Sequence, residues 1–201
     1  MDLVRASHLY KVFGKNERQV IERLKAGESR EELASLGTAA VIDVSFEVAK
    51  GETFVVMGLS GSGKSTLIRM INGLWSPSEG TVEVAGKVVS DMNDAQLRAL
   101  RRDHVSMVFQ HFALLPHLTV RENAAYGLKL QGKLKQKERL EKANEWLNTV
   151  GLNGWGDKYP HQLSGGMQQR VGLARALAAE TDILLMDEAF SALDPLIRRE
   201  M

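Results

Sequence analysis

The spacing of apolar residues along the chain predicts short strands interleaved with helices. Residues 3–13 and the alternating positions 41–48 predict two strands, and the β-branched and aromatic run 53–57 predicts a buried third strand. The same patterns predict helices over 17–25, 65–73 and 93–102 and a further helix within the stretch 163–179, a hairpin over 80–89, and strands over 105–109 and 183–186, the last fully buried. The chain is therefore expected to be an α/β protein.

Residues 15–37 predict two small amphipathic helices inserted before the second strand. Val20, Ile21 and Leu24 share one face of the first, and the capping box Ser29-Arg30-Glu31-Glu32 opens the second. The pair faintly resembles a helix-turn-helix, but its second helix is not basic. A surface-packed insertion is therefore favoured over a DNA-binding element.

From residue 111 to about 158 the pattern becomes helical, which predicts a separate helical lobe. Its lysines crowd together but alternate with glutamates, so a solvated face is favoured over a binding patch.

The most informative stretch is Gly58–Ser65, which fits the phosphate-loop pattern G-x-x-x-x-G-K-[ST]. It follows a predicted strand and opens a predicted helix, the context that this motif requires. Glycines at 58, 61 and 63 bare the backbone and permit positive φ, so that N–H groups can point at a phosphate. Lys64 can then reach the β- and γ-phosphates, and the Ser65 hydroxyl can ligate Mg²⁺. The alternative, a glycine-rich turn without function, requires the lysine, the hydroxyl and both flanking elements to coincide by chance.

An acidic pair, Asp187-Glu188, follows the apolar run 183–186, and ligands bind at the carboxyl ends of strands in α/β sheets. In phosphate-loop enzymes an acid there holds Mg²⁺, and its neighbour can orient or deprotonate the attacking water. An acidic pair beside a buried strand would be costly without a cation or water site.

Two further positions stay open on local physics. Ser164, Gly165 and Gly166 begin a helix and form either an anion-binding end or a plain N-cap. Phe13 ends the first strand, where it could stack on a nucleotide base or belong to the core.

Composition excludes several classes of function. The 201 residues carry 26 basic and 25 acidic side chains, a net charge of +1 that gives no reason to expect nucleic acid or an anionic membrane surface as the main partner. The absence of cysteine excludes disulfides and thiol chemistry. Without an apolar leader or a run of membrane-spanning length, we expect a soluble, cytoplasmic chain.

With both motifs in place, Leu163–Gln168 resembles the LSGGQ signature of ATP-binding cassette (ABC) ATPases, with Met167 where glutamine is usual. The resemblance covers the chain from about residue 3 onward. It implies a P-loop NTPase core of ABC ATPase type, with an antiparallel β subdomain and an inserted helical subdomain. Residues 1–110 would be the N-terminal part of the core with the insertion at about 15–37, residues 111–162 the helical subdomain, and residues 163–201 the signature helix, Walker B and D-loop.

The resemblance also implies residue roles. Glu188 would be the catalytic base, Gln110 would sense the attacking water, and Lys64 would hold phosphate, while Ser65, Gln110 and Asp187 would hold Mg²⁺. ATP would contact Phe13 as the base-stacking aromatic, Gly58, Ser60, Gly61, Ser62, Gly63, Lys64, Ser65 and Thr66 of Walker A, Ser164, Gly165 and Gly166 of the signature, and Asp194 of the D-loop. Two copies would face head to tail, so that the signature of one completes the phosphate site of the other.

Within the family, the chain resembles ATPase subunits of bacterial glycine betaine/proline importers through residues 57–66, 112–117 and 187–198 and the insertion after Phe13. This implies osmoprotective uptake of quaternary amines, through transmembrane permease subunits and a solute-binding protein, by a subunit on the inner face of the membrane. Choline, histidine or another amino acid are alternative solutes. A soluble ABC ATPase outside transport, a P-loop kinase and a non-catalytic interaction module are alternative classes.

One departure concerns the C-terminal part of the family's pattern. The family has a further strand that ends in a switch histidine, whereas no histidine follows position 161 here, and the sequence stops inside a predicted helix begun by Pro195. A truncated chain is expected, without the CBS-domain pair often found in betaine-type subunits. We expect it to bind MgATP but to hydrolyse it poorly by itself.

Overall fold

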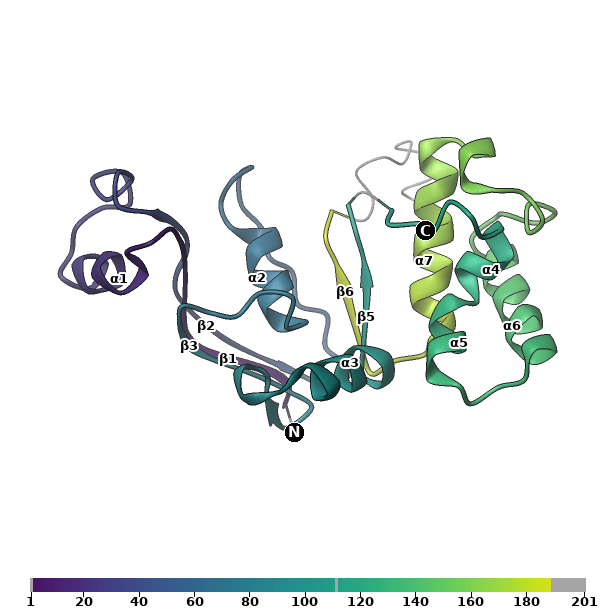
Figure 1. Cartoon of the computed structure of the whole chain (residues 1–201), viewed down its shortest axis with the longest axis horizontal. Helices are drawn as coiled ribbons and strands as arrows, with labels where there is room; N and C mark the ends of the chain where they lie inside the picture. The colour runs from purple at the N-terminus through teal and green to yellow at the C-terminus, as the bar shows by residue number, and fades with distance from the viewer. Residues whose placement is uncertain (1, 111, 189–201) are drawn as a thin grey trace. The chain divides into compact units, whose positions relative to one another are not determined.

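The computed structural model describes residues 2–110 and 112–188, without the side chain of Asp2 (Figure 1). The chain divides into two compact units, residues 1–97 and 98–201, which we call unit 1 and unit 2. No helix among the described residues is long and apolar enough to cross a membrane.

Unit 1 is built on a four-stranded antiparallel sheet in the order β2-β1-β3-β4. Its strands are β1 (Asp2–Phe13), β2 (Thr38–Ala49), β3 (Glu79–Val84) and β4 (Lys87–Val88). In the central strand, Ala6 lies opposite Phe46 of β2 and Val82 of β3. Because side chains alternate between the faces of a sheet, apolar residues at every second position of β1 and β3 become buried together. The strands predicted over 3–13 and 41–48 and the hairpin predicted over 80–89 are thus confirmed.

The insertion forms one helix, not two. Helix α1 (Glu17–Lys25) has the predicted bounds, whereas residues 30–36 form consecutive turns. The predicted second helix is therefore wrong, although its capping contacts exist: the Ser29 N–H donates to the Glu32 carboxylate over 2.8 Å. Its backbone hydrogen bonds do not form a helical ladder, because the N–H groups of Ala34 and Leu36 donate to carbonyls three residues back, those of Glu31 and Leu33. Leu33 is nevertheless fully buried, and it packs with Val20 against the end of the sheet.

The predicted strand over 53–57 is also absent. The segment has no regular secondary structure and forms no ladder among the described residues, and Val55 and Met57 are 67% and 87% exposed. Phe54 instead stacks on Phe46 of β2, with ring centroids 4.8 Å apart, beside a hollow of about 490 Å³. An apolar run specifies burial, but a strand needs a hydrogen-bonding neighbour, and this segment has none in the described part of the chain. After it comes α2 (Lys64–Ile71), close to the predicted helix.

Unit 2 contains a two-stranded parallel sheet of β5 (Val105–Val108) and β6 (Ile183–Met186). The strands lie where predicted, but full burial of β6 is wrong: Ile183 is buried, while Leu184 and Met186 are each 37% exposed. The reason is that β6 has one partner strand among the described residues. Helix α3 (Asp94–Asp103) precedes β5 and begins just before the boundary between the units, after the short 3₁₀ turn Val89–Asp91.

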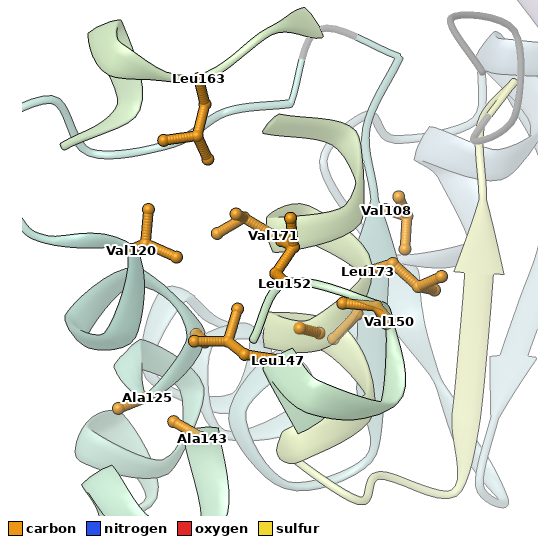
Figure 2. Packing of buried hydrophobic residues seen from close by; sticks show 13 residues of the cluster. Val108, Val120, Ala125, Ala143, Leu147, Val150, Leu152, Leu163, Val171 and Leu173 are labelled. Atoms are coloured by element: carbon orange, nitrogen blue, oxygen red, sulfur yellow. The ribbon is translucent and has the colours of Figure 1, made fainter. Parts of the chain in front are cut away.

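The helices of unit 2 are α4 (Val120–Ala124), α5 (Tyr126–Gln131), α6 (Gln136–Thr149) and α7 (Gly165–Ala178), with a 3₁₀ turn at Pro160–Gln162. The helical pattern expected from residue 111 onward therefore begins only at Val120. Figure 2 shows Leu147 of α6, Val171 of α7 and Leu152 pointing into one apolar core. This core supports α7, whose first turn carries the signature residues.

Candidate nucleotide-binding and catalytic sites

The phosphate loop, residues 58–65, joins the segment 53–57 to α2 in unit 1. Gly63 caps the helix with a left-handed φ of 93°, and a Cβ on it would lie 2.0 Å from the Ala40 carbonyl oxygen. No other residue could occupy this position without moving β2. Gly61 also has a positive φ of 79°. Gly58 does not, contrary to expectation; a Cβ there would meet the Ser62 Oγ at 2.6 Å, so that the serine hydroxyl would have to rotate away.

Lys64 folds over its own loop. Its Nζ donates to the carbonyl oxygens of Gly58 and Leu59, each over 2.9 Å. The ammonium group is thus held across the loop by backbone oxygens, at the first position of α2, where the free N–H groups of the helix also favour an anion. This arrangement suits a phosphate, whose oxygens could replace the two carbonyls as partners of the lysine.

Phe13 lies at the end of β1, and its side chain is 38% exposed. The ring is only partly covered. It makes an edge contact with the Trp75 ring, and the Lys11 ammonium lies 5.3 Å from its centroid. A half-exposed aromatic face is suitable for stacking on a base. The role of Phe13 stays a prediction.

In unit 2 the sheet brings three predicted residues together. Gln110 follows β5 and the pair Asp187-Glu188 follows β6; since the strands are parallel, all three lie at the same edge. The Gln110 amide Nε2 donates to the Glu188 Oε2 over 2.8 Å, and the Asp187 N–H donates to the Val108 carbonyl over 3.0 Å. Asp187 is 2% exposed, so its carboxylate is shielded from water, whereas Glu188 is exposed. This edge therefore pairs one buried acid with one accessible acid.

The signature residues begin α7. Ser164 is the N-cap, and its Oγ accepts from the Met167 N–H over 3.3 Å, so the plain capping role is present. Gly165 and Gly166 occupy the first helical turn, where backbone N–H groups have no partner within the helix. Gln168 fixes the preceding chain by donating to the carbonyls of Pro160 and Leu163, each over 3.1 Å. Capping leaves the glycine N–H groups able to bind an anion, so both interpretations stay compatible.

A residue that the sequence analysis missed is Arg175 on α7. Its guanidinium donates to the carbonyl oxygens of Phe112 and Ala113 over 3.0 and 2.7 Å, and burial lowers its pKa from the ordinary value. Phe112 and Ala113 both have left-handed φ values, 45° and 47°, which are unfavourable for residues other than glycine. Arg175 thus holds a strained segment that begins two residues after Gln110. A lone charge within the apolar spacing of 171–178 was the available signal.

The predicted Mg²⁺ ligands are an alcohol, an amide and a carboxylate, which supply the hard oxygen donors that this ion prefers. Ser65 belongs to unit 1, while Gln110 and Asp187 belong to unit 2. Among the described residues, no three histidine, aspartate or glutamate side chains lie close enough together to hold a metal ion by themselves. Asp194 lies outside the described residues.

Comparison with known proteins places these motifs in context. The family model described as ABC transporter matches residues 41–191. The glycine betaine transport ATP-binding protein OpuAA of Bacillus subtilis (strain 168) is 54% identical over 98% of this chain and 48% of its own length. The glycine betaine/proline betaine transport system ATP-binding protein ProV of Escherichia coli (strain K12) is 51% identical over 96% and 49%.

A third relative, the trimethylamine N-oxide transport system ATP-binding protein TmoW of Ruegeria pomeroyi (strain ATCC 700808 / DSM 15171 / DSS-3), is 48% identical over 99% of this chain and 58% of its own length. The chain spans about half the length of the first two relatives. Among solved structures, the dimeric ATP-binding cassette MJ0796 bound to ADP and Pi after hydrolysis matches with a TM-score of 0.84 and 34% identity, over 98% of this chain and 78% of that one. The α/β fold expected from the sequence is thereby confirmed as that of an ABC cassette.

Proposed function

Because this chain belongs to the ABC transporter family, we propose that it is the ATP-binding and hydrolysing part of a solute importer. The observation that carries this proposal is the phosphate loop at the start of α2, with the Lys64 ammonium held across it by the Gly58 and Leu59 carbonyls. A phosphate entering the loop would exchange places with these carbonyls and would gain the N–H groups of the helix start. Phe13 would stack on the base.

The chain's own residues can divide the hydrolytic work. The exposed Glu188 would orient or deprotonate water, and the Gln110 amide fixes one of its carboxylate oxygens. The buried Asp187, together with Ser65 and Gln110, would hold Mg²⁺, which supplies charge neutralisation to the phosphates when bound. The interpretations of Lys64, Gln110 and Glu188 as catalytic residues follow from this chemistry.

We further propose that two copies assemble head to tail, so that Ser164 and the N–H groups of Gly165 and Gly166 bind the nucleotide held by the other copy. The dimeric state of the similar cassette MJ0796 supports this arrangement. Hydrolysis would then weaken the assembly, because binding that differs between two states shifts their populations.

The proposed solute is a quaternary amine such as glycine betaine or a proline betaine, in keeping with the names of OpuAA and ProV. In this role the chain would act at the inner face of the membrane through permease subunits, with a solute-binding protein supplying the substrate. Import of trimethylamine N-oxide is a second candidate, because TmoW shares 48% identity over nearly the whole chain.

The enzymatic proposal is tested by Glu188→Gln, with the exposed surface change Glu145→Gln as the matched control. Glu188→Gln should keep MgATP bound and shift the chain to a dimer in size-exclusion chromatography with light scattering, whereas the control should behave as wild type. Absence of MgATP affinity in the wild-type chain would disprove the proposal. Loss of phosphate transfer without ATP-dependent dimerisation would favour a kinase.

The solute is tested in the cells that carry the gene. Deleting the gene should abolish uptake of radiolabelled glycine betaine at high osmolarity, and returning the intact gene should restore it. Unchanged betaine uptake combined with lost uptake of trimethylamine N-oxide, choline or histidine would replace the proposed solute.

A further inference from the structure

Three side chains of unit 1 contact one another in series beside the predicted base site. The rings of Phe13 and Trp75 meet edge-on, with centroids 5.1 Å apart and planes inclined at 78°. The Arg69 guanidinium lies 4.9 Å from the centre of the Trp75 ring. Such edge-to-face and cation–π contacts are favourable beyond the area that they bury. We call this set the Arg69–Trp75–Phe13 cluster.

The chain that follows α2 places Trp75 with little freedom. The N–H groups of Leu74 and Trp75 both donate to the Arg69 carbonyl, over 2.9 and 3.1 Å. The Leu74 N–H also donates to the Oδ1 of Asn72, a residue only 3% exposed. Trp75 is therefore fastened by its backbone to the last turn of the helix that begins at Lys64.

The backbone beside Phe13 is held from a second direction. The Val12 N–H donates to the Ser78 Oγ over 3.1 Å, and the Ser78 N–H donates to the Tyr10 carbonyl over 2.8 Å. Gly37, where the insertion returns to the sheet, approaches so closely that a Cβ on it would lie 3.2 Å from the Phe13 carbonyl oxygen. The main chain of Phe13 is thus fixed, while its ring is 38% exposed, meets the Trp75 ring edge-on and has the Lys11 ammonium 5.3 Å from its centroid.

We propose that Trp75, backed by Arg69, is a positioning residue that sets the orientation of the Phe13 ring for stacking on the nucleotide base. This inference rests on the proposed nucleotide binding and adds a specificity element to it. Helix α2 then contributes to both ends of the nucleotide site. Its first residue, Lys64, would bind the phosphates, and its last turn holds the backbone of Trp75, which orients the Phe13 ring. An unsupported Phe13 ring would lose part of its binding free energy in becoming ordered.

The test compares a ligand with a base and a ligand without one. Isothermal titration calorimetry with MgATP and with magnesium tripolyphosphate would be run on wild type, Trp75→Ala and Trp75→Phe. Trp75→Ala should weaken MgATP binding about two- to tenfold and leave tripolyphosphate binding unchanged, and Trp75→Phe should restore most of the loss because it retains an aromatic edge. Trp155→Ala, a 37% exposed tryptophan of unit 2, is the matched control and should change neither affinity.

A double-mutant cycle shows whether Trp75 acts through Phe13. Phe13→Ala alone should weaken MgATP about fivefold or more, and adding Trp75→Ala in that background should cost nothing further. Equal weakening of both ligands by Trp75→Ala, no effect on either, or additive losses in the cycle would overturn the inference. If Trp75→Ala does not fold, Trp75→Leu keeps apolar bulk without the ring and must give the same selective loss. Failure of wild type to bind either ligand would instead refute the proposed function itself.

Discussion

At the scale of single residues, the phosphate loop depends on one backbone position more than on any side chain. Gly63 combines a left-handed φ of 93° with an approach to Ala40 that leaves no room for a Cβ. The strain comes from conformation and from a clash with backbone, and neither can be relieved by a change of rotamer. This position therefore couples the loop to β2.

Gly63→Ala is expected to lower the free energy of unfolding by about 2–3 kcal/mol and to abolish MgATP binding, because the loop must shift to admit a methyl group. Gly51→Ala is the matched control: Gly51 has a similar φ of 81°, but a Cβ there meets nothing within 4 Å. The control should cost about 1 kcal/mol and keep binding. Urea unfolding and calorimetry measure both effects, and equal costs would show that the contact with Ala40 is unimportant.

At this scale the sequence was informative wherever a motif fixes chemistry and spacing together, as at Lys64 and at Glu188. It could not reveal the contact partners of Trp75 and Arg175, because these partners, Phe13 and the segment at 112–113, are 62 or more positions away along the chain. Contacts of that kind depend on the tertiary fold, and no local pattern encodes them.

At the scale of elements, the loop before α4 depends on one buried amide. Asn123 is fully buried, and its Oδ1 accepts from the Leu115 N–H over 2.8 Å. Its Nδ2 donates to the carbonyls of Leu115, Leu118 and Thr119 over 3.0, 3.1 and 3.0 Å. This side chain supplies the hydrogen bonds that residues 115–119 would otherwise obtain from a helix or sheet.

Asn123→Ala should therefore destabilise the chain by about 3 kcal/mol or more, because a buried N–H and several carbonyls lose their partner. The exposed Asn148→Ala on α6 is the control and should stay within about 0.5 kcal/mol of wild type. The comparison requires denaturant unfolding of both variants. A small cost for Asn123→Ala would mean that water replaces the amide.

A pH dependence follows from the capping box of the same helix. The Thr119 N–H and hydroxyl both donate to Glu122, and these hydrogen bonds lower the pKa of the Glu122 carboxyl below its ordinary 4.5. A lowered folded-state pKa means that the carboxylate stabilises the fold above pH 4.5 and loses this effect as the pH falls through the folded value. Between pH 5 and 3, the free energy of unfolding of Glu122→Gln should thus fall less steeply than that of wild type. Urea unfolding at each pH measures this difference. Parallel declines would contradict this.

The elements that were predicted wrongly share a cause. Residues 30–36 and 53–57 carry correct local signals, a capping box and a β-branched run, yet form no regular element among the described residues. In the first, the N–H groups of Ala34 and Leu36 donate to carbonyls three residues back, as in turns, and the second has no neighbouring strand there. Patterns report what a segment buries, whereas hydrogen-bonded partners decide whether it becomes a helix or a strand.

At the scale of the whole molecule, the chain carries separate apolar cores. Leu9 of β1, fully buried, belongs to unit 1, and Leu147 of α6, 1% exposed, belongs to unit 2. The apolar cluster around Leu147 is formed by residues of unit 2, and the cluster around Leu33 by residues of unit 1. The family, and with it the fold, followed from three motifs, whereas this division into units did not follow from any of them.

Leu147→Ala should cost about 2–5 kcal/mol and speed hydrogen exchange in α4, α6 and α7 while leaving β1 and β3 unchanged. Leu9→Ala is the reciprocal variant and should speed exchange in the sheet of unit 1 alone. Hydrogen exchange with mass spectrometry resolves both regions. Faster exchange throughout the chain in either variant would show that the two cores unfold as one.

The buried guanidinium of Arg175 has a mechanical consequence. Helix α7 starts at the signature glycines. About 15 Å further along its axis, Arg175 donates to the carbonyl oxygens of Phe112 and Ala113. Because a helix is stiff, α7 cannot rotate or shift along its axis at one of these places without moving at the other. If two copies assemble as proposed, a displacement of the serine end by the partner would therefore also move Arg175 and, with it, the segment at 112–113 that it holds by hydrogen bonds.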